Sequence, residues 1–235
     1  MTSLVPGPRL LVVEHQATCP PALLGVWLAD NDCSLVVARP YLGEALPSSL
    51  RAEGYDGLLV LGGSMDADDD DGHPWLAPTR ALVVAAAEED VATLGVCLGH
   101  QLAALALGGE VVRNPRGQQV GLRRIGWASG EDRLLDGVSG PGVFWNQDVV
   151  TRLPDGAAEL ARADTGELQA ARFGARVWGV QWHPEADAAL LADWARKDAD
   201  RHLEQGLDQD RVLAEVEAVR PALAATGRAL ADRLA

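Results

Sequence analysis

Cys97 has the sequence surroundings of an enzymatic nucleophile. It follows an apolar run that predicts a strand and precedes a segment that predicts a helix, with Gly95 and Gly99 two residues away on either side. This is the cysteine counterpart of the G-x-S-x-G turn, in which glycine avoids collision with a nucleophile held in a strained backbone. The helix N-terminus would favour the thiolate, and the Leu98 N–H could bind a developing oxyanion. The alternative is a buried structural cysteine, as we expect for Cys19 and Cys33.

His183 and Glu185 are candidates for the base and the group that orients it. A cysteine nucleophile needs a base, usually held by a third side chain. His183 comes directly after a predicted strand, and Glu185 follows two residues later, close enough to hold the imidazole. Neutral imidazole can take the thiol proton and return it to a leaving amine. The sequence therefore predicts a Cys-His-Glu arrangement for amide hydrolysis.

The paired glycines Gly62 and Gly63 end another predicted strand. Glycine lets the backbone approach a ligand, so the Gly63 N–H is a candidate second oxyanion donor beside Leu98, although such a pair is often only a turn. Asp66 and the run 68–71 follow. Clustered carboxylates suggest a metal, but charge runs are usually solvated, so we expect a solvated loop and no metal.

The remaining histidines carry weaker signals. His15 ends the first predicted strand, and strand ends are where ligands gather in open sheets, so it could line the site. His100 is expected to pack within the helix after Cys97, and His73 lies in a predicted loop. His202 occurs in a charged helical stretch and is expected to be solvated.

The first half of the chain alternates short apolar runs with helix-like segments. The predicted strands are 10–14, 35–38, 57–61 and 92–96, and the predicted helices are 20–28, 76–90 and 98–107. Continuous apolar strands in this order indicate a doubly wound, mostly parallel α/β sheet with helices on both faces. The carboxyl ends of such strands share one rim, which would bring Gly63 and Cys97 together.

The second half changes character. The runs that look like antiparallel strands are 111–113, 120–125, 143–145, 168–173 and 177–181, with a hairpin turn at 173–176. A helical tail follows, interrupted near Gly206 and Pro221. We therefore predict one catalytic domain over 1–190 and a helical C-terminal extension over 191–235. The extension would pack on the domain, or serve as a dimer or partner interface.

Composition narrows the class of protein. The chain has 235 residues and a net charge of −14, which argues against nucleic-acid binding because phosphates would be repelled. Three cysteines are too few for a disulfide scaffold and suit a reducing cytoplasm. The chain opens without a signal-peptide pattern, and no apolar run approaches the length needed to span a membrane.

Three blocks together resemble the class I (triad) glutamine amidotransferases, including the glutaminase domain of GMP synthetase. They are Leu61-Gly62-Gly63-Ser64, Gly95-Val96-Cys97-Leu98-Gly99-His100-Gln101 and Gly179-Val180-Gln181-Trp182-His183-Pro184-Glu185. The resemblance implies a flavodoxin-like fold, L-glutamine as substrate and no cofactor. It implies that Cys97 attacks the glutamine amide, that His183 and Glu185 complete the triad, that Gly63 and Leu98 form the oxyanion hole, and that Gly62 and Gln101 hold the substrate.

The chain also departs from that family. Asn146 stands where histidine is frequent, and neither a synthetase domain nor a phosphate-binding loop for ATP follows the triad. We therefore expect a stand-alone glutaminase that passes ammonia to a separate synthetase subunit. The alternatives are a self-sufficient hydrolase of another γ-glutamyl or small amide, and a regulatory binding protein without turnover.

Overall fold

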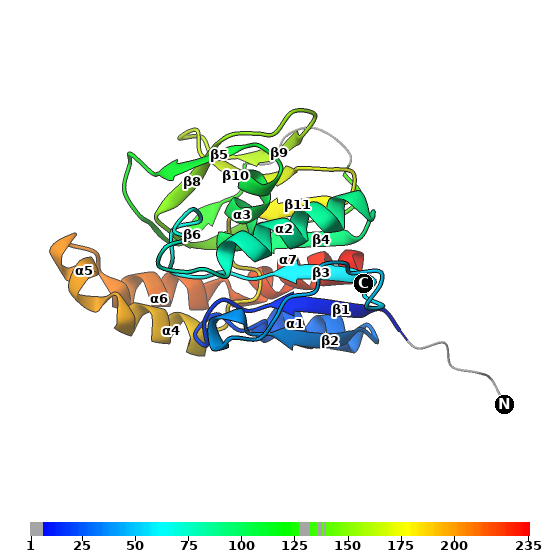
Figure 1. The fold of residues 1–235 in the computed structure, drawn as a ribbon. Coiled ribbons are helices and arrows are strands. Elements are labelled where there is room, and N and C mark those ends of the chain that lie inside the picture. The colour runs from blue at the N-terminus through cyan, green and yellow to red at the C-terminus, as the bar shows by residue number, and fades with distance from the viewer. Residues whose placement is uncertain (1–6, 127–131, 136–137, 139) are drawn as a thin grey trace.

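A seven-stranded sheet forms the centre of the protein (Figure 1). The structure is a computed structural model that describes residues 7–126, 132–135, 138 and 140–235. The sheet has the order β2-β1-β3-β4-β11-β10-β9. Its strands are β1 (Arg9–Val13), β2 (Ser34–Ala38), β3 (Gly57–Val60), β4 (Ala92–Val96), β9 (Ala158–Arg162), β10 (Leu168–Arg172) and β11 (Val177–Val180).

The pairing confirms the predicted α/β sheet. β2, β1, β3, β4 and β11 are mutually parallel, whereas β10 is antiparallel to both β11 and β9. The hairpin predicted at 173–176 joins β10 to β11. Because β3, β4 and β11 are neighbours and run in one direction, the residues that follow them lie at one rim.

Alternating side chains divide the sheet into two apolar faces. On one face, Leu10 and Val12 pack with α1 (Ala22–Asp30) and α7 (Arg220–Leu234). On the other face, Leu11 and Val13 pack with α2 (Leu76–Glu88) and α3 (Leu98–Ala106). The two-residue period of the strands therefore fixes which helices lie on which side.

Two short antiparallel sheets stand beside the central sheet. β5 (Glu110–Arg113) pairs with β8 (Asp148–Arg152), and β6 (Gln119–Arg124) pairs with β7 (Pro141–Asn146). The sequence indicated β5, β6, β7, β10 and β11 but not β8 or β9. Both missed strands are five residues long and carry charged residues, so their apolar pattern is weak.

Four helices form the C-terminal part: α4 (Ala188–Lys197), α5 (Ala199–Glu204), α6 (Gln209–Ala218) and α7. The side chains of Asp187 and Asp208 cap α4 and α6. The interruption predicted near Gly206 lies between α5 and α6, and the one predicted near Pro221 occurs at Val219, since Pro221 is in the first turn of α7. Helix α4 runs across residue 190, where the predicted boundary lies. The division into 1–190 and 191–235 stays a prediction.

The described part of the chain contains no helix that is both long enough and apolar enough to cross a bilayer. The sequence predicts no signal peptide at the start of the chain. That prediction falls largely on residues 1–6, which lie outside the described residues.

Candidate active site

Cys97 sits in the strained turn that its flanking glycines predict. It joins β4 to α3 with φ 51° and ψ −103°, a backbone conformation that residues other than glycine rarely adopt. Its N–H donates to the carbonyl of Val180 at 2.9 Å, which ties the turn to β11. A Cβ at Gly95 would overlap the carbonyl of Gly99, and a Cβ at Gly99 would overlap the carbonyl of Val60. The two glycines are therefore required by backbone packing under the cysteine.

His183 and Glu185 form a buried pair three and five residues beyond the end of β11. The His183 Nδ1 and Glu185 Oε1 atoms lie 2.7 Å apart, and both side chains are buried. The His183 N–H donates to the carbonyl of Val143 at 2.8 Å, which holds the loop against β7. Burial alone would lower the pKa of His183, but the Glu185 carboxylate and Cys97 outweigh it, so the pKa lies above its ordinary 6.5. The site therefore favours the imidazolium.

The thiol and the imidazole meet beside Gly62. A Cβ at Gly62 would lie 3.1 Å from His183 Cε1 and 3.6 Å from Cys97 Cβ, so a larger residue would press on both side chains. Within the described residues the His183 Nε2 atom has no hydrogen-bond partner. That nitrogen is free to exchange a proton with the thiol or with a substrate.

The oxyanion candidates Gly63 and Leu98 are also adjacent. Leu98 is the first residue of α3, so its N–H has no acceptor inside the helix. A Cβ at Gly63 would lie 2.7 Å from Leu98 Cδ2, so the β3 loop and the start of α3 are in contact. Gly63 lines the cavity that contains Cys97. The glycine loop after β3 and the N-terminus of α3 thus both border the thiol.

A cavity of about 240 Å³ contains Cys97 and His183. Gln101 lines it, and its Nε2 donates to the Asp148 carbonyl at 3.0 Å and to Gln181 Oε1 at 3.2 Å. Asn146 also lines the cavity and donates to the same carbonyl at 3.0 Å. The residue that departs from the family pattern therefore has a wall position at this site.

The sequence did not predict that the C-terminal helices form another wall. The Trp194 ring of α4 packs on the His183 imidazole with centroids 4.5 Å apart, and its Nε1 donates to the Thr18 carbonyl at 2.7 Å. The Trp145 Nε1 donates to Asp198 Oδ2 at 2.8 Å. We name Trp194, Lys197, Asp198 and Arg201 the C-terminal wall, since all four line the cavity. No local sequence signal marked Trp194 as a cavity residue, because α4 has the ordinary amphipathic pattern of a packed helix.

Cys19 also belongs to the cavity lining, although its sequence context gave no sign of this. Its thiol is buried, and burial, the Glu185 carboxylate and Cys97 together raise its pKa to about 12. The Gln16 Nε2 atom donates to its sulfur at 3.2 Å. Cys19 is therefore held as a neutral thiol near the candidate nucleophile.

His15 and His100 are fully buried, and neither lines the cavity that contains Cys97. Burial lowers the pKa of both His15 and His100 to about 3, so both are neutral in the interior. The solvated position expected for His202 is wrong. That side chain is fully buried against Trp145, with ring centroids 5.3 Å apart, because the charged helix α5 folds over β7.

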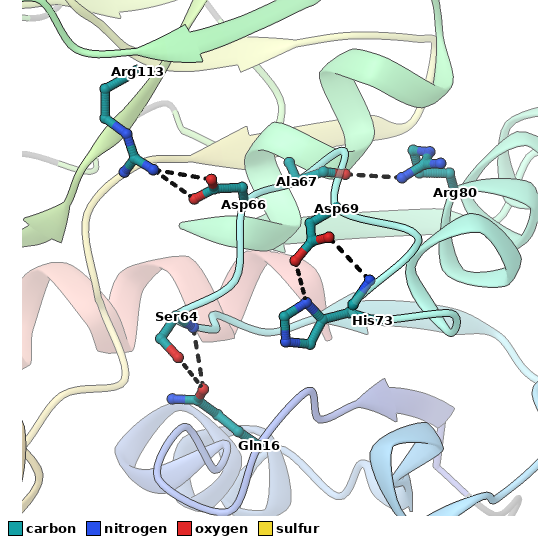
Figure 2. Close-up of polar contacts among 9 residues, drawn as sticks. Gln16, Ser64, Asp66, Ala67, Asp69, His73, Arg80 and Arg113 are labelled. Carbon is teal, nitrogen blue, oxygen red and sulfur yellow. Dashed lines mark hydrogen bonds and ion pairs between the residues drawn. The ribbon is translucent and has the colours of Figure 1, made fainter.

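The acidic run after β3 is held by basic partners (Figure 2). Asp66 accepts two hydrogen bonds from Arg113 at 2.8 and 3.0 Å, and Asp69 pairs with His73 at 2.9 Å. Arg80 donates to the carbonyl of Ala67 at 2.8 Å. These contacts fix the loop that carries Gly63 into the cavity.

Comparisons with known proteins agree with this architecture. Residues 28–191 match the family model described as glutamine amidotransferase class-I. The chain is 36% identical over 137 residues to a GMP synthase (glutamine-hydrolysing) subunit of Methanosarcina mazei, covering 57% of this chain and 66% of that relative. It is 28% identical over 187 residues to gamma-glutamyl peptidase 5 of Arabidopsis thaliana, covering 74% of this chain and 71% of the peptidase.

A solved glutamine amidotransferase from Thermotoga maritima superposes with a TM-score of 0.86 at 24% identity, covering 97% of each chain. That likeness extends the shared fold over the C-terminal helices, while the alignment with the Methanosarcina relative stays just under two thirds of that protein's length. The family match covers more than half of this chain and includes the turn at Cys97 and the His183–Glu185 pair. The chain therefore belongs to the class-I glutamine amidotransferase family.

Proposed function

We propose that this protein hydrolyses γ-glutamyl amides, glutamine first among them, through a thioester on Cys97. One observation carries the proposal: a strained cysteine and a buried histidine that pairs with Glu185 line the same cavity. Gly63 and Leu98 supply the candidate oxyanion donors beside them. Each group that amide hydrolysis through a covalent intermediate requires is thus available at one site.

The reaction proceeds in two halves. The Cys97 sulfur attacks the side-chain carbonyl carbon, and the N–H groups of Gly63 and Leu98 stabilise the oxyanion that forms. The C–N bond then breaks, and the leaving nitrogen takes a proton from the His183 imidazolium, which leaves a γ-glutamyl thioester. Water attacks the thioester and gives a proton to His183. The C–S bond breaks, and glutamate and free Cys97 are released.

Glutamine as the substrate and a synthetase as the recipient of ammonia are supported by relatives. The Methanosarcina relative is named as one subunit of a glutamine-hydrolysing GMP synthase. By analogy, this chain would release ammonia for a separate synthetase subunit, and the cavity position of Gln101 fits a role in holding the glutamyl group. Homodimerisation stays a prediction, which light scattering of the full chain would test.

A second candidate is a self-sufficient hydrolase of larger γ-glutamyl amides. Two observations favour it: the Arabidopsis relative is named a gamma-glutamyl peptidase, and the C-terminal wall adds charged side chains to the cavity. Both candidates use the same thioester chemistry.

The test is the release of glutamate and ammonia from glutamine by the wild type and by Cys97→Ala. We expect Cys97→Ala to lose at least about 10³-fold in kcat, as happens when a nucleophile is removed. Cys19→Ala is the matched control, because it removes the second thiol of the cavity and should retain activity. Equal activity of Cys97→Ala and the wild type would show that the chain is a binding protein or uses another group.

A further inference from the structure

Lys197 is the only lysine in the chain. It ends α4, is exposed and lines the cavity that contains Cys97. Its Nζ donates to Ser64 Oγ at 3.3 Å. No carboxylate among the described residues lies within ion-pair distance of it. An ammonium has three donors, so at least two stay available for a ligand.

The other cations of the cavity are already paired with carboxylates. Arg113 contacts Asp66 at 2.8 Å and Asp148 at 3.1 Å. Arg201 lies 3.7 Å from Asp198. Lys197 is therefore the cavity cation that, within the described chain, has no negative partner. In a protein with a net charge of −14, an anionic group entering the site needs such a local cation.

The contact at Ser64 is held in place from the other side. The Ser64 N–H and Oγ both donate to Gln16 Oε1, at 3.2 and 2.8 Å (Figure 2). Because the hydroxyl proton goes to Gln16, the Ser64 oxygen is left to accept from Lys197. The loop after β3 thus positions the ammonium before a substrate arrives.

Lys197 lies on the side of the cavity where a leaving group departs. The leaving nitrogen must face His183, because it takes its proton from that imidazole. Trp194 packs directly on His183, and Lys197 is three residues later on the same helix, hence on the same face. Gln101 and Asn146 line the cavity from α3 and β7 instead. Whatever the leaving nitrogen carries therefore approaches the C-terminal wall.

We propose that Lys197 binds a carboxylate on the leaving amine, so that the preferred substrates are γ-glutamyl amino acids or short γ-glutamyl peptides. This rests on the proposed thioester chemistry. The bonds broken and the protons transferred are the same as for glutamine. The C–N bond breaks, His183 supplies the proton, and an amino acid or peptide departs instead of ammonia. Lys197 is a specificity-determining residue in this reaction and takes no part in bond breaking.

The test compares three substrates: γ-glutamylglycine, γ-glutamylglycinamide and glutamine. The first two share a leaving amine and differ in the carboxylate. We expect the wild type to prefer γ-glutamylglycine to its amide by up to about fivefold in kcat/KM, the upper range for an exposed ion pair. Lys197→Gln should remove that preference through KM, leaving kcat/KM for the amide and for glutamine within about twofold, and Lys197→Arg should restore part of it.

Arg196→Gln is the matched control. Arg196 is the neighbouring basic residue, is exposed and pairs with Asp193 outside the cavity lining. The Arg196→Gln variant also loses one positive charge, and it should leave kcat/KM for all three substrates unchanged. Loss of the preference in Arg196→Gln as well would reduce the effect to general electrostatics and overturn the assignment.

The outcomes separate this inference from the proposed function. Turnover of glutamine through Cys97 without any preference for γ-glutamylglycine would overturn the role of Lys197 and leave the thioester chemistry standing. A preference that survives Lys197→Gln would do the same. Failure of all three substrates with the wild type would overturn the proposed function and this inference with it.

Discussion

At the scale of single residues, two features set the chemistry of the site. Cys97 is held at a positive φ, and His183 is buried against Glu185. The strained backbone keeps the sulfur at the cavity, and the carboxylate keeps the imidazole charged and oriented. Both features are tested without knowledge of the physiological substrate.

Glu185→Gln should move the alkaline limb of the pH profile to lower pH. The carboxylate stabilises the imidazolium, so without it His183 loses its proton at a lower pH. Measurement of kcat/KM for glutamine against pH checks this. Asp193→Asn, which removes an exposed carboxylate on α4, should leave the limb where it is. An unchanged limb in Glu185→Gln would assign the limb to a different group.

Cys97→Gly should be more stable than Cys97→Ala. Both variants lack the thiol, but only alanine keeps the unfavourable backbone conformation at φ 51°. We expect a difference of about 1 kcal/mol in the free energy of unfolding, opposite in sign to the usual cost of glycine. Urea denaturation measures it. A more stable alanine variant would mean that the turn is not strained.

At the scale of elements, the β4–turn–α3 unit depends on close backbone packing. Gly99→Ala should reduce the free energy of unfolding by about 3 kcal/mol, since its Cβ would overlap the Val60 carbonyl of β3. Gly174→Ala is the control, because its Cβ would meet nothing closer than 3.6 Å, and it should change stability by less than about 1 kcal/mol. Similar stabilities in denaturant would contradict the close approach of α3 to β3.

The elements of the first half were predictable from sequence because their signals are local. The apolar runs of β1 to β4 and the glycines around Cys97 can be identified from a few consecutive residues, without knowledge of distant contacts. Strands β8 and β9 were missed because short, partly charged strands depend on their partners. The burial of His202 and the C-terminal wall could not be predicted, since both result from docking of a charged tail on distant residues.

At the scale of the whole molecule, the C-terminal helices are part of the core and of the cavity. Leu230 of α7 packs in the same apolar cluster as Leu10 and Val12 of β1, and Trp194 of α4 packs on His183. Figure 1 shows α7 running along the sheet, while α4, α5 and α6 lie beyond the ends of its strands, on the left of the view. The tail therefore links the stability of the fold to the shape of the site.

Leu230→Ala should reduce the free energy of unfolding by about 2–5 kcal/mol, because Leu230 is fully buried. Leu203→Ala makes the same chemical change on a side chain that is 80% exposed and should have an effect below about 0.5 kcal/mol. Chemical denaturation of both variants measures the difference. Equal effects would mean that α7 is not docked on the sheet in solution.

The most direct test of the thioester mechanism is capture of the covalent intermediate. The wild type is mixed with glutamine, quenched rapidly in acid and digested, and the peptides are measured by mass spectrometry. The thioester mechanism predicts a γ-glutamyl adduct on the peptide that contains Cys97, with none on Cys19 and none in Cys97→Ala. Steady turnover of glutamine without that adduct at any quench time, or turnover that persists in Cys97→Ala, would contradict it.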